Sequence, residues 1–157
     1  MGKVVITGVE TTLGRRVARL AAGEDGADVV GLARATVAGL PARVSVYRVD
    51  PASDDVKPHL EHADAVVHLA TSAPAGPTAP TDDVAVARRV LDAAGDMGVA
   101  HVVVLSSAVV YGAWADNPVP LTEDATLRPN PGFAFAAERA EIERLTAEWR
   151  DAHPGAT

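Results

Sequence analysis

The chain has 157 residues, a formal net charge of −7 and 48% hydrophobic residues, which indicates one domain with a sizeable core. The acidic balance, and the lack of a basic patch interleaved with aromatic residues, argue against nucleic acid as a partner. Cysteine is absent, which excludes disulfides and thiolate metal sites, and no apolar run approaches the roughly 20 residues that span a bilayer. No signal-peptide pattern precedes the first strand, so we expect a cytoplasmic protein without a membrane partner.

The first strand, turn and helix organise the rest of the chain. The run Lys3–Thr7 ends at Gly8, and a helical pattern begins near Gly14. In a doubly wound fold the pyrophosphate of a dinucleotide binds at such a turn, against the free amides of the helix N-terminus. A full Thr-Gly-x-x-Gly-x-x-Gly pattern would have a glycine in place of Thr11, whose side chain is expected to point toward the phosphate and weaken binding.

Strand and helix patterns alternate along the whole chain. The predicted strands are Lys3–Thr7, Asp28–Ala33, Val44–Val49, Ala65–Leu69 and His101–Ser106. The predicted helices are Leu13–Ala22, a short one at Asp54–Glu61, Asp82–Met97 and Phe133–Ala152, and the predicted loops are Thr36–Ala42, Thr71–Thr81 and Ala113–Asn130. This alternation predicts an α/β fold with a Rossmann-like, doubly wound parallel sheet. Right-handed crossovers and a switch point beside the first strand give the strand order 3-2-1-4-5.

Five stretches along the chain follow one family pattern in order and spacing. They are Thr7-Gly8 to Gly14, Asp50, Asp64-Ala65-Val66-Val67-His68-Leu69-Ala70, Leu105-Ser106-Ser107-Ala108-Val109-Val110-Tyr111-Gly112, and the segment Pro129–Arg139. In these stretches the chain resembles the extended short-chain dehydrogenase/reductase family, of the NAD-dependent epimerase/dehydratase type. The resemblance implies a cofactor site at Gly8, Thr11, Leu13, Gly14, Asp50, Leu69 and Ala70. It places Asp50 at the adenine and Ser107 at the catalytic serine.

The acid–base pair of that family, a tyrosine followed four residues later by a lysine, is missing. In the best register Phe135 occupies the tyrosine position and Arg139 the lysine position, and Glu143 follows four residues later. The two tyrosines of the chain, Tyr47 and Tyr111, have no lysine four residues later. Phenylalanine cannot transfer a proton and arginine stays charged, so we expect little or no hydride transfer. Whether the chain is an enzyme is left open.

The choice of cofactor is predicted from the end of the second strand. NAD enzymes usually have an acidic residue there, about 20 residues after the glycine turn, to bind the ribose 2′-hydroxyl. This chain has Ala33 followed by Arg34, whose guanidinium is suited to a 2′-phosphate. We therefore expect NADP(H) in preference to NAD(H), with no cofactor at all as the alternative.

Three functions remain open at this point. The first is an oxidoreductase or epimerase relative that is impaired in redox catalysis, and the second is a non-catalytic Rossmann scaffold or subunit that acts through its surface. The third is a non-redox enzyme that reuses the pocket, with the candidate groups Ser107, Tyr111, Asp116, Glu123 and Asp124. His59 and His62 lack a third ligand, so no metal site is expected.

The sequence stops after the last predicted helix. We therefore expect residues 1–157 to form a single NAD(P)-binding Rossmann-type domain, without the C-terminal substrate domain that the family resemblance implies. The missing strands would leave apolar surface exposed beside the fifth strand. In family members, helices like Asp82–Met97 and Phe133–Ala152 commonly form a four-helix dimer interface. The expected partners are a dinucleotide, an unknown small molecule, and a second copy or a partner chain.

Overall fold

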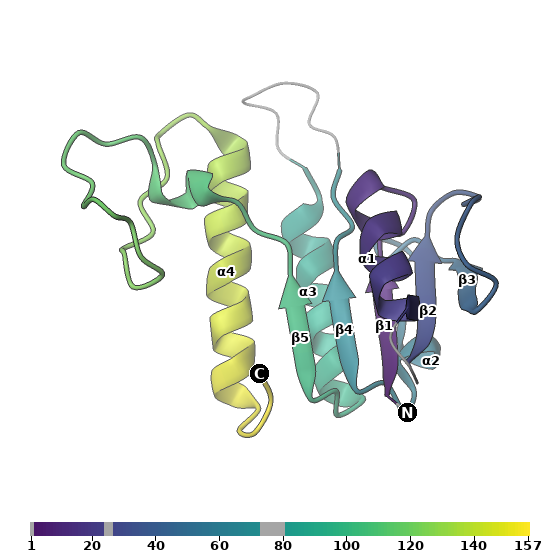
Figure 1. The fold of residues 1–157 in the computed structure, drawn as a ribbon. Coiled ribbons are helices and arrows are strands. Elements are labelled where there is room, and N and C mark those ends of the chain that lie inside the picture. The colour runs from purple at the N-terminus through teal and green to yellow at the C-terminus, as the bar shows by residue number, and fades with distance from the viewer. Residues whose placement is uncertain (1, 24–26, 73–80) are drawn as a thin grey trace.

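The computed structural model describes residues 2–23, 27–72 and 81–157. Its strands are β1 (Lys3–Thr7), β2 (Asp28–Ala33), β3 (Val44–Arg48), β4 (Ala65–His68) and β5 (His101–Val104). Its helices are α1 (Thr12–Gly23), α2 (Lys57–Leu60), α3 (Asp83–Asp96) and α4 (Ala134–Ala152), with a 3₁₀ turn at Ala108–Tyr111. The strands form one sheet with helices packed against it (Figure 1).

The strand order is β3-β2-β1-β4-β5, and every neighbouring pair is parallel, which confirms the sequence prediction. The order reverses beside β1, because the chain first moves outward to β3 and then returns to the other side of β1 with β4. At such a switch point the loops after the two central strands diverge and leave a crevice. Thr7, the last residue of β1, pairs with Leu32 and with His68, so three strands end level with one another at this crevice.

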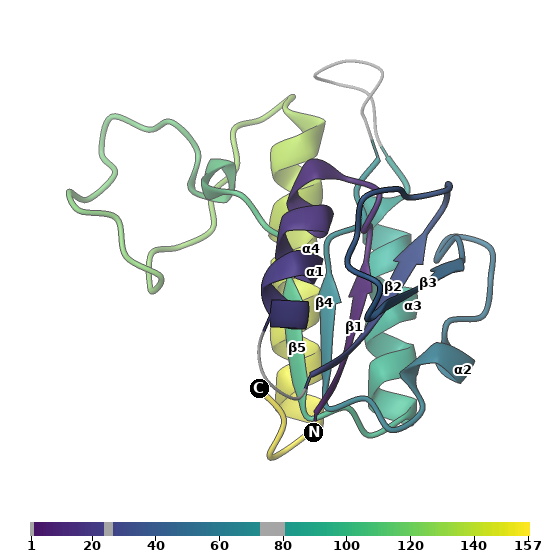
Figure 2. The same ribbon diagram turned by 45° about the vertical axis from the view of Figure 1, so that its right-hand side comes forward.

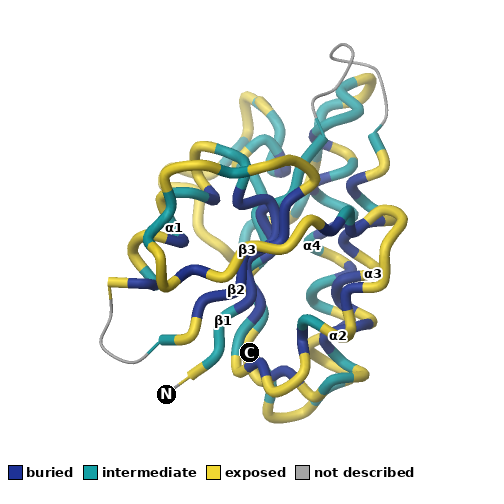
Figure 3. Tube along the Cα trace, turned by 90° about the vertical axis from the view of Figure 1, so that its right-hand side faces the viewer, coloured by how far each residue is buried: buried dark blue, intermediate teal, exposed yellow. Residues whose placement is uncertain are grey.

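Helices cover both faces of the sheet. α1 packs against β1 and β2 on one face, and α3 and α4 lie side by side on the other (Figures 1 and 2). The near-continuous apolar sequence of β2 is typical of a parallel strand buried on both faces, and all but its first residue are buried. The burial pattern in Figure 3 shows this buried middle layer.

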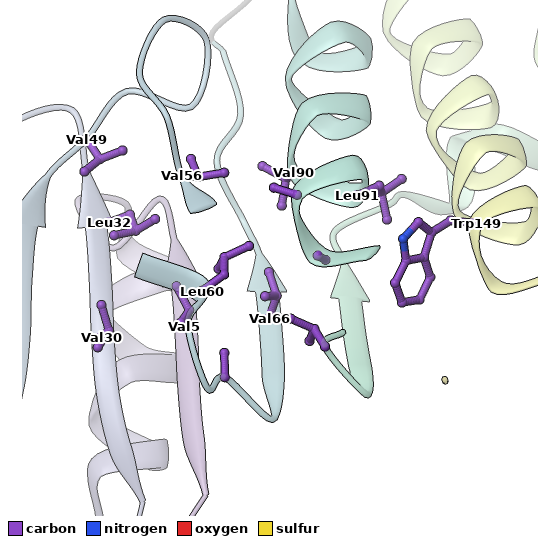
Figure 4. Close-up of a cluster of buried hydrophobic side chains, with 14 of the residues drawn as sticks. Val5, Val30, Leu32, Val49, Val56, Leu60, Val66, Val90, Leu91 and Trp149 are labelled. Carbon is purple, nitrogen blue, oxygen red and sulfur yellow. The ribbon is translucent and has the colours of Figure 1, made fainter. Parts of the chain in front are cut away.

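The main hydrophobic cluster fills the space between the sheet and α3. Val5 and Val66 come from the central strands, Leu60 from α2, Val90 from α3 and Trp149 from α4 (Figure 4). A second cluster lies on the α1 side of the sheet and includes Ile6, Val9, Ala18, Val29 and Leu69. The two clusters fix the carboxyl edge of the sheet from both sides and thereby position the loops that leave it.

The short helix predicted at Asp54–Glu61 begins later than expected, at Lys57. The Asp54 carboxylate accepts a hydrogen bond from the backbone N–H of Asp50, and the Asp55 carboxylate accepts one from the N–H of Lys57. Aspartate side chains that bond to nearby backbone groups compete with the helix and favour turns. The predicted start at Asp54 is therefore wrong by three residues.

Other element ends differ by one or two residues. β3 and β4 each end one residue before the predicted end, and β5 ends two residues before it, at Val104. The 3₁₀ turn was not predicted. It begins after Ser107, whose hydroxyl accepts a hydrogen bond from the N–H of Val109 at 3.5 Å. Residues 73–80 of the predicted loop Thr71–Thr81 lie outside the described residues.

β5 lies at one edge of the sheet, and part of its surface is exposed, as expected. Val103 is 54% exposed. Thr157 pairs with this edge, since its N–H donates to the carbonyl of Ala100 at 2.9 Å and its carbonyl accepts from the N–H of Val102 at 2.7 Å. Within the part of the chain that the structure describes, no helix has the length and apolar character needed to cross a membrane.

Candidate functional site

Only glycine fits at two positions where the chain leaves β1 and enters α1, one in the turn and one in the first turn of the helix. Gly8 has a φ of +75°, and a Cβ there would lie 2.7 Å from the nitrogen of Ala70. A Cβ on Gly14 would lie 2.1 Å from the carbonyl oxygen of Gly8. The turn is therefore packed tightly against the residues that follow β4, and it lies at the carboxyl end of β1 (Figure 1).

Thr11 takes the position of the missing glycine, and its hydroxyl is turned inward. The hydroxyl donates to the carbonyl of Gly8 at 2.8 Å and accepts from the N–H of Gly14 at 2.9 Å. The Thr11 hydroxyl thus caps the turn, and the expectation that this side chain weakens phosphate binding stays a prediction. Within the described residues the amides of Thr12 and Leu13 have no protein acceptor, as is normal in the first turn of a helix.

A small cavity lies beside this turn, where the loops after β2, β3 and β4 meet. Its volume is about 140 Å³, and its lining includes Arg34, Asp50, Ala70 and Ser72. The carboxylate of Asp50 accepts a hydrogen bond from the N–H of Ala52 at 3.0 Å, which fixes its direction. Of the predicted positions, Arg34, Asp50 and Ala70 thus come together at the switch point, and Leu69 is buried in the cluster on the α1 side of the sheet.

Arg34 connects three of the loops at this edge. Its Nε forms an ion pair with Oε1 of Glu10 at 3.2 Å, and its Nη2 donates to the carbonyl of Thr71 at 3.0 Å. Oε2 of Glu10 is buried and has no hydrogen-bond partner within the described residues. Sequence reasoning missed Glu10, because it lies inside the glycine turn rather than at the end of β2, where a ribose-binding acid is usually sought.

Arg139, at the position of the family's lysine, is buried and only 2% exposed. It forms a buried ion pair with Asp83, its guanidinium lies 5.1 Å from the ring centre of Phe135, and it reaches the carbonyl of Leu105 at 3.5 Å. Asp83 also accepts a hydrogen bond from the N–H of Ser72 at 2.8 Å. The structure therefore brings Phe135 and Arg139 together at the end of β5, but the Arg139 charge is already paired.

A second buried polar group, His68, lies at the end of β4. The hydroxyl of Thr7 accepts from the amides of Leu69 and Ala70, each at 3.2 Å, and lies 2.8 Å from Nδ1 of His68. Which of the two groups donates in the Thr7–His68 hydrogen bond is set by the tautomer of the ring. Burial is the main cause that lowers the pKa of His68 to about 4.

Ser107, at the position of the catalytic serine, is half-buried and uses its hydroxyl to cap the 3₁₀ turn. Its neighbour Ser106 instead lines a cavity of about 520 Å³ between β5, α4 and the loop after the 3₁₀ turn. There the Ser106 hydroxyl donates to the carboxylate of Glu143. This cavity is larger than the one at the switch point but lies on the far side of β5, away from the glycine turn.

The structure does not bring the candidate groups for a non-redox site together in one place. Glu123 lines the cavity beside α4, whereas Asp116 and Asp124 line a separate hollow in the loop. Asp116 is held by two hydrogen bonds from Arg128, at 3.0 and 2.9 Å, which lower its pKa. Tyr111 ends the 3₁₀ turn. Among the described residues, no group of three or more histidine, aspartate or glutamate side chains could hold a metal ion.

Three solved structures show the likeness of this chain to known proteins. MoeE5, in complex with UDP-glucose and NAD, is 26% identical with a TM-score of 0.80, and the match covers 99% of this chain and 51% of that one. UDP-N-acetylglucosamine 4-epimerase from Methanobrevibacter ruminantium M1 is 20% identical with a TM-score of 0.81, covering 97% and 51%. UDP-glucuronic acid 4-epimerase from Bacillus cereus, in complex with UDP-glucuronic acid and NAD, is 19% identical with a TM-score of 0.79, covering 96% and 53%.

The chain thus spans about half the length of these solved structures. A search of curated proteins gave no match. The sequence matches one protein family, described as the NAD dependent epimerase/dehydratase family, over residues 4–157, which is almost the whole chain. On this match, together with the glycine turn and the strand order, the chain belongs to the NAD dependent epimerase/dehydratase family.

Proposed function

We propose that residues 1–157 form a single NAD(P)-binding domain, which binds a nicotinamide dinucleotide across the carboxyl ends of β1, β2 and β4. The observation that carries this proposal is the turn around Gly8 and Gly14, where these two positions admit no side chain and the amides of Thr12 and Leu13 have no acceptor among the described residues. These amides, at the positive end of α1, suit the pyrophosphate. MoeE5, the similar chain at 26% identity, is solved with NAD.

We assign the remaining parts of the dinucleotide to the adjoining loops. We place the adenine at the cavity beside Asp50 and Ala70, and the adenosine ribose near Arg34. The NADP(H) preference expected from the sequence is part of this proposal, because Ala33 offers no carboxylate to repel a 2′-phosphate. The Arg34 side chain is 41% exposed and within reach of a ligand.

We further propose that the protein is impaired in redox catalysis. A bound nicotinamide dinucleotide supplies hydride chemistry, but a carbonyl substrate also needs a proton donor and a group that holds its oxygen. Ser107 can hold an oxygen, whereas Phe135 has no proton to give. Arg139 is buried in its ion pair with Asp83, a packing role that favours the second candidate function, a non-catalytic Rossmann subunit. A cytoplasmic location and self-association remain predictions.

The binding proposal is tested by removing one amide of α1 without disturbing the helix. Thr12 is exposed and is the first residue of α1, a position where proline is favoured. Thr12→Pro deletes the N–H, whereas the control Thr12→Ala keeps it. Because a hydrogen bond to a charged group contributes about 1.5–3 kcal/mol, Thr12→Pro should weaken NADPH binding roughly 10- to 100-fold in calorimetric titrations.

Comparison of Thr12→Pro with Thr12→Ala separates the loss of the N–H from the loss of the threonine side chain. Thr12→Ala should bind NADPH as the native chain does, and both variants should unfold at similar urea concentrations. Equal affinity of the two variants would mean that the α1 amides do not hold the ligand. Failure of the native chain to bind either NADPH or NADH would overturn the proposal and leave the scaffold function.

A further inference from the structure

The carboxylate of Glu10 lies in the glycine turn, directly beside the guanidinium of Arg34. The two residues are 24 positions apart, and the fold brings them together because the turn after β1 and the loop after β2 leave the sheet at the same edge. The Nε–Oε1 distance is 3.2 Å. Side-chain exposure is 41% for Arg34 and 19% for Glu10, so the pair is partly desolvated and open on the arginine side.

From this geometry we infer that Glu10 determines the choice between NAD(H) and NADP(H), by accepting the ribose 2′-hydroxyl and by competing with a 2′-phosphate for Arg34. The inference rests on the proposed dinucleotide site. The usual sequence rule for cofactor choice considers the residue at the end of β2, whereas Glu10 lies in the turn after β1.

The first support is the unused acceptor on Glu10. Oε1 is engaged by Arg34, but Oε2 is buried and has no hydrogen-bond partner within the described residues. A buried carboxylate oxygen without a donor is costly, and the partner that removes the cost is an N–H or O–H group. A ribose hydroxyl is such a donor, and Arg34, the partner of Glu10, lines the neighbouring cavity together with Asp50 and Thr71.

The second support is the balance of charge. A 2′-phosphate is attracted by Arg34 but repelled by Glu10, and the two opposite charges lie within one contact distance of each other. To bind the phosphate fully, Arg34 must turn away from Glu10 or share its donors with it. A 2′-hydroxyl has no charge, so it binds without any change in the contact between Arg34 and Glu10. Glu10 therefore lowers the affinity for NADP(H) below the value that Arg34 alone would give, so the NADP(H) preference that Arg34 confers is narrower than it would be without Glu10.

The test compares affinities for NADPH and NADH in matched variants. Glu10→Gln removes the negative charge and keeps the shape of the side chain. Glu61→Gln removes one negative charge at an exposed position beyond α2, so it controls for the net charge of the molecule. Arg34→Ala, alone and combined with Glu10→Gln, shows whether the effect of Glu10 passes through Arg34.

We expect Glu10→Gln to raise the ratio of NADPH to NADH affinity about tenfold, and Glu61→Gln to leave it unchanged. In the Arg34→Ala background the same change should give a clearly smaller gain. Dinucleotide binding with an unaltered ratio in Glu10→Gln, or an equal change in Glu61→Gln, would overturn the inference and leave the binding proposal standing. Absence of binding in every variant would overturn the binding proposal, and the inference with it.

Discussion

His68 links the stability of the carboxyl edge to pH. Its ring shares a hydrogen bond with the hydroxyl of Thr7, and it is only 4% exposed. Burial lowers its pKa from 6.5 to about 4. The sequence shows this histidine at the end of an apolar strand, but the cost of charging it follows from its burial, which the structure supplies.

We expect the free energy of unfolding to fall as the pH drops from 6.5 toward about 4. In this window the unfolded chain binds a proton at residue 68 and the folded chain does not, so stability rises with pH. At about 1.4 kcal/mol for each pH unit, the loss approaches about 3 kcal/mol at the acid end. Urea unfolding at about pH 7.5 and about pH 4.5 measures it.

The variant His68→Asn isolates this contribution, because asparagine can still form a hydrogen bond with the Thr7 hydroxyl but does not titrate. It should show a smaller loss of stability on acidification than the native chain. The control His62→Asn, at an exposed residue with a φ of 58° that asparagine tolerates, should retain the native loss. A native-like pH dependence in His68→Asn would assign the effect to other groups.

Phe135 and Arg139 stand where the family resemblance implies tyrosine and lysine, and the lack of a proton donor at Phe135 is the reason for the prediction of weak catalysis. Restoring the pair with Phe135→Tyr and Arg139→Lys returns a proton donor, and a general acid is typically worth 10²–10⁴-fold. We expect the native chain to show no turnover above background, and the double variant to show measurable turnover. The assay is cofactor oxidation over aldehydes, ketones and nucleotide sugars, with each single variant as a control. Robust native turnover would mean that another group supplies the proton.

At the residue scale, the spacing of Gly8 and Gly14 predicts the turn after the first strand, whereas the assignment of Arg139 to the lysine position comes from the family resemblance. Spacing could not predict what Thr11 does, since a hydroxyl can point outward or cap its own turn. It also could not find Glu10, because the contact with Arg34 depends on how two loops meet at the sheet edge.

At the scale of elements, two adjacent residues of α4 bind the start of α3. Glu138 accepts hydrogen bonds from the N–H and hydroxyl of Thr81, at 2.5 and 2.9 Å, and Arg139 pairs with Asp83. Asp83 in turn holds the N–H of Ser72, in the loop after β4. The two helices thus form one unit with the loop that borders the dinucleotide site.

Removing the Asp83 charge should destabilise this unit strongly. Asp83→Asn leaves the Arg139 guanidinium buried without a counter-charge, which typically costs about 3–5 kcal/mol. Asp82→Asn, at the exposed neighbouring position, should cost far less. Urea unfolding of both variants measures the difference, and the double change Asp83→Asn with Arg139→Met should recover part of the loss. Equal stability of the two single variants would show that the buried pair contributes little.

The helices and strands could be predicted well where their buried apolar residues recur at the spacing of a helix or a strand. β1, β2 and α3 match the sequence pattern closely, because their apolar positions follow the strand or helix repeat. α2 could not be placed as well, because the side chains of Asp54 and Asp55 form turns that compete with the helix. Local polar bonds, rather than hydrophobic periodicity, decided that boundary.

At the scale of the molecule, the described surface is divided between apolar and charged regions. The exposed large apolar side chains lie on α1, β3, β5 and the loop after the 3₁₀ turn: Leu13, Leu20, Val46, Tyr47, Val103, Val119 and Leu121. The outer face of α3 and α4 instead carries charges of both signs, with Arg88 and Asp92 on α3 and Arg144 and Glu148 on α4. A two-fold axis beside this face can bring opposite charges together.

We therefore expect self-association through α3 and α4 that weakens with salt, because exposed charge pairs are screened at high ionic strength. Sedimentation velocity should show a dimer at roughly 0.15 M salt and its partial dissociation at roughly 1 M. Ala85→Trp places a large side chain on the exposed face of α3 and should prevent the dimer. Leu20→Lys, on the exposed side of α1, should leave it intact. A dimer that resists salt and is lost in Leu20→Lys would place the contact on the apolar α1 side, and a monomer at every concentration would contradict self-association itself.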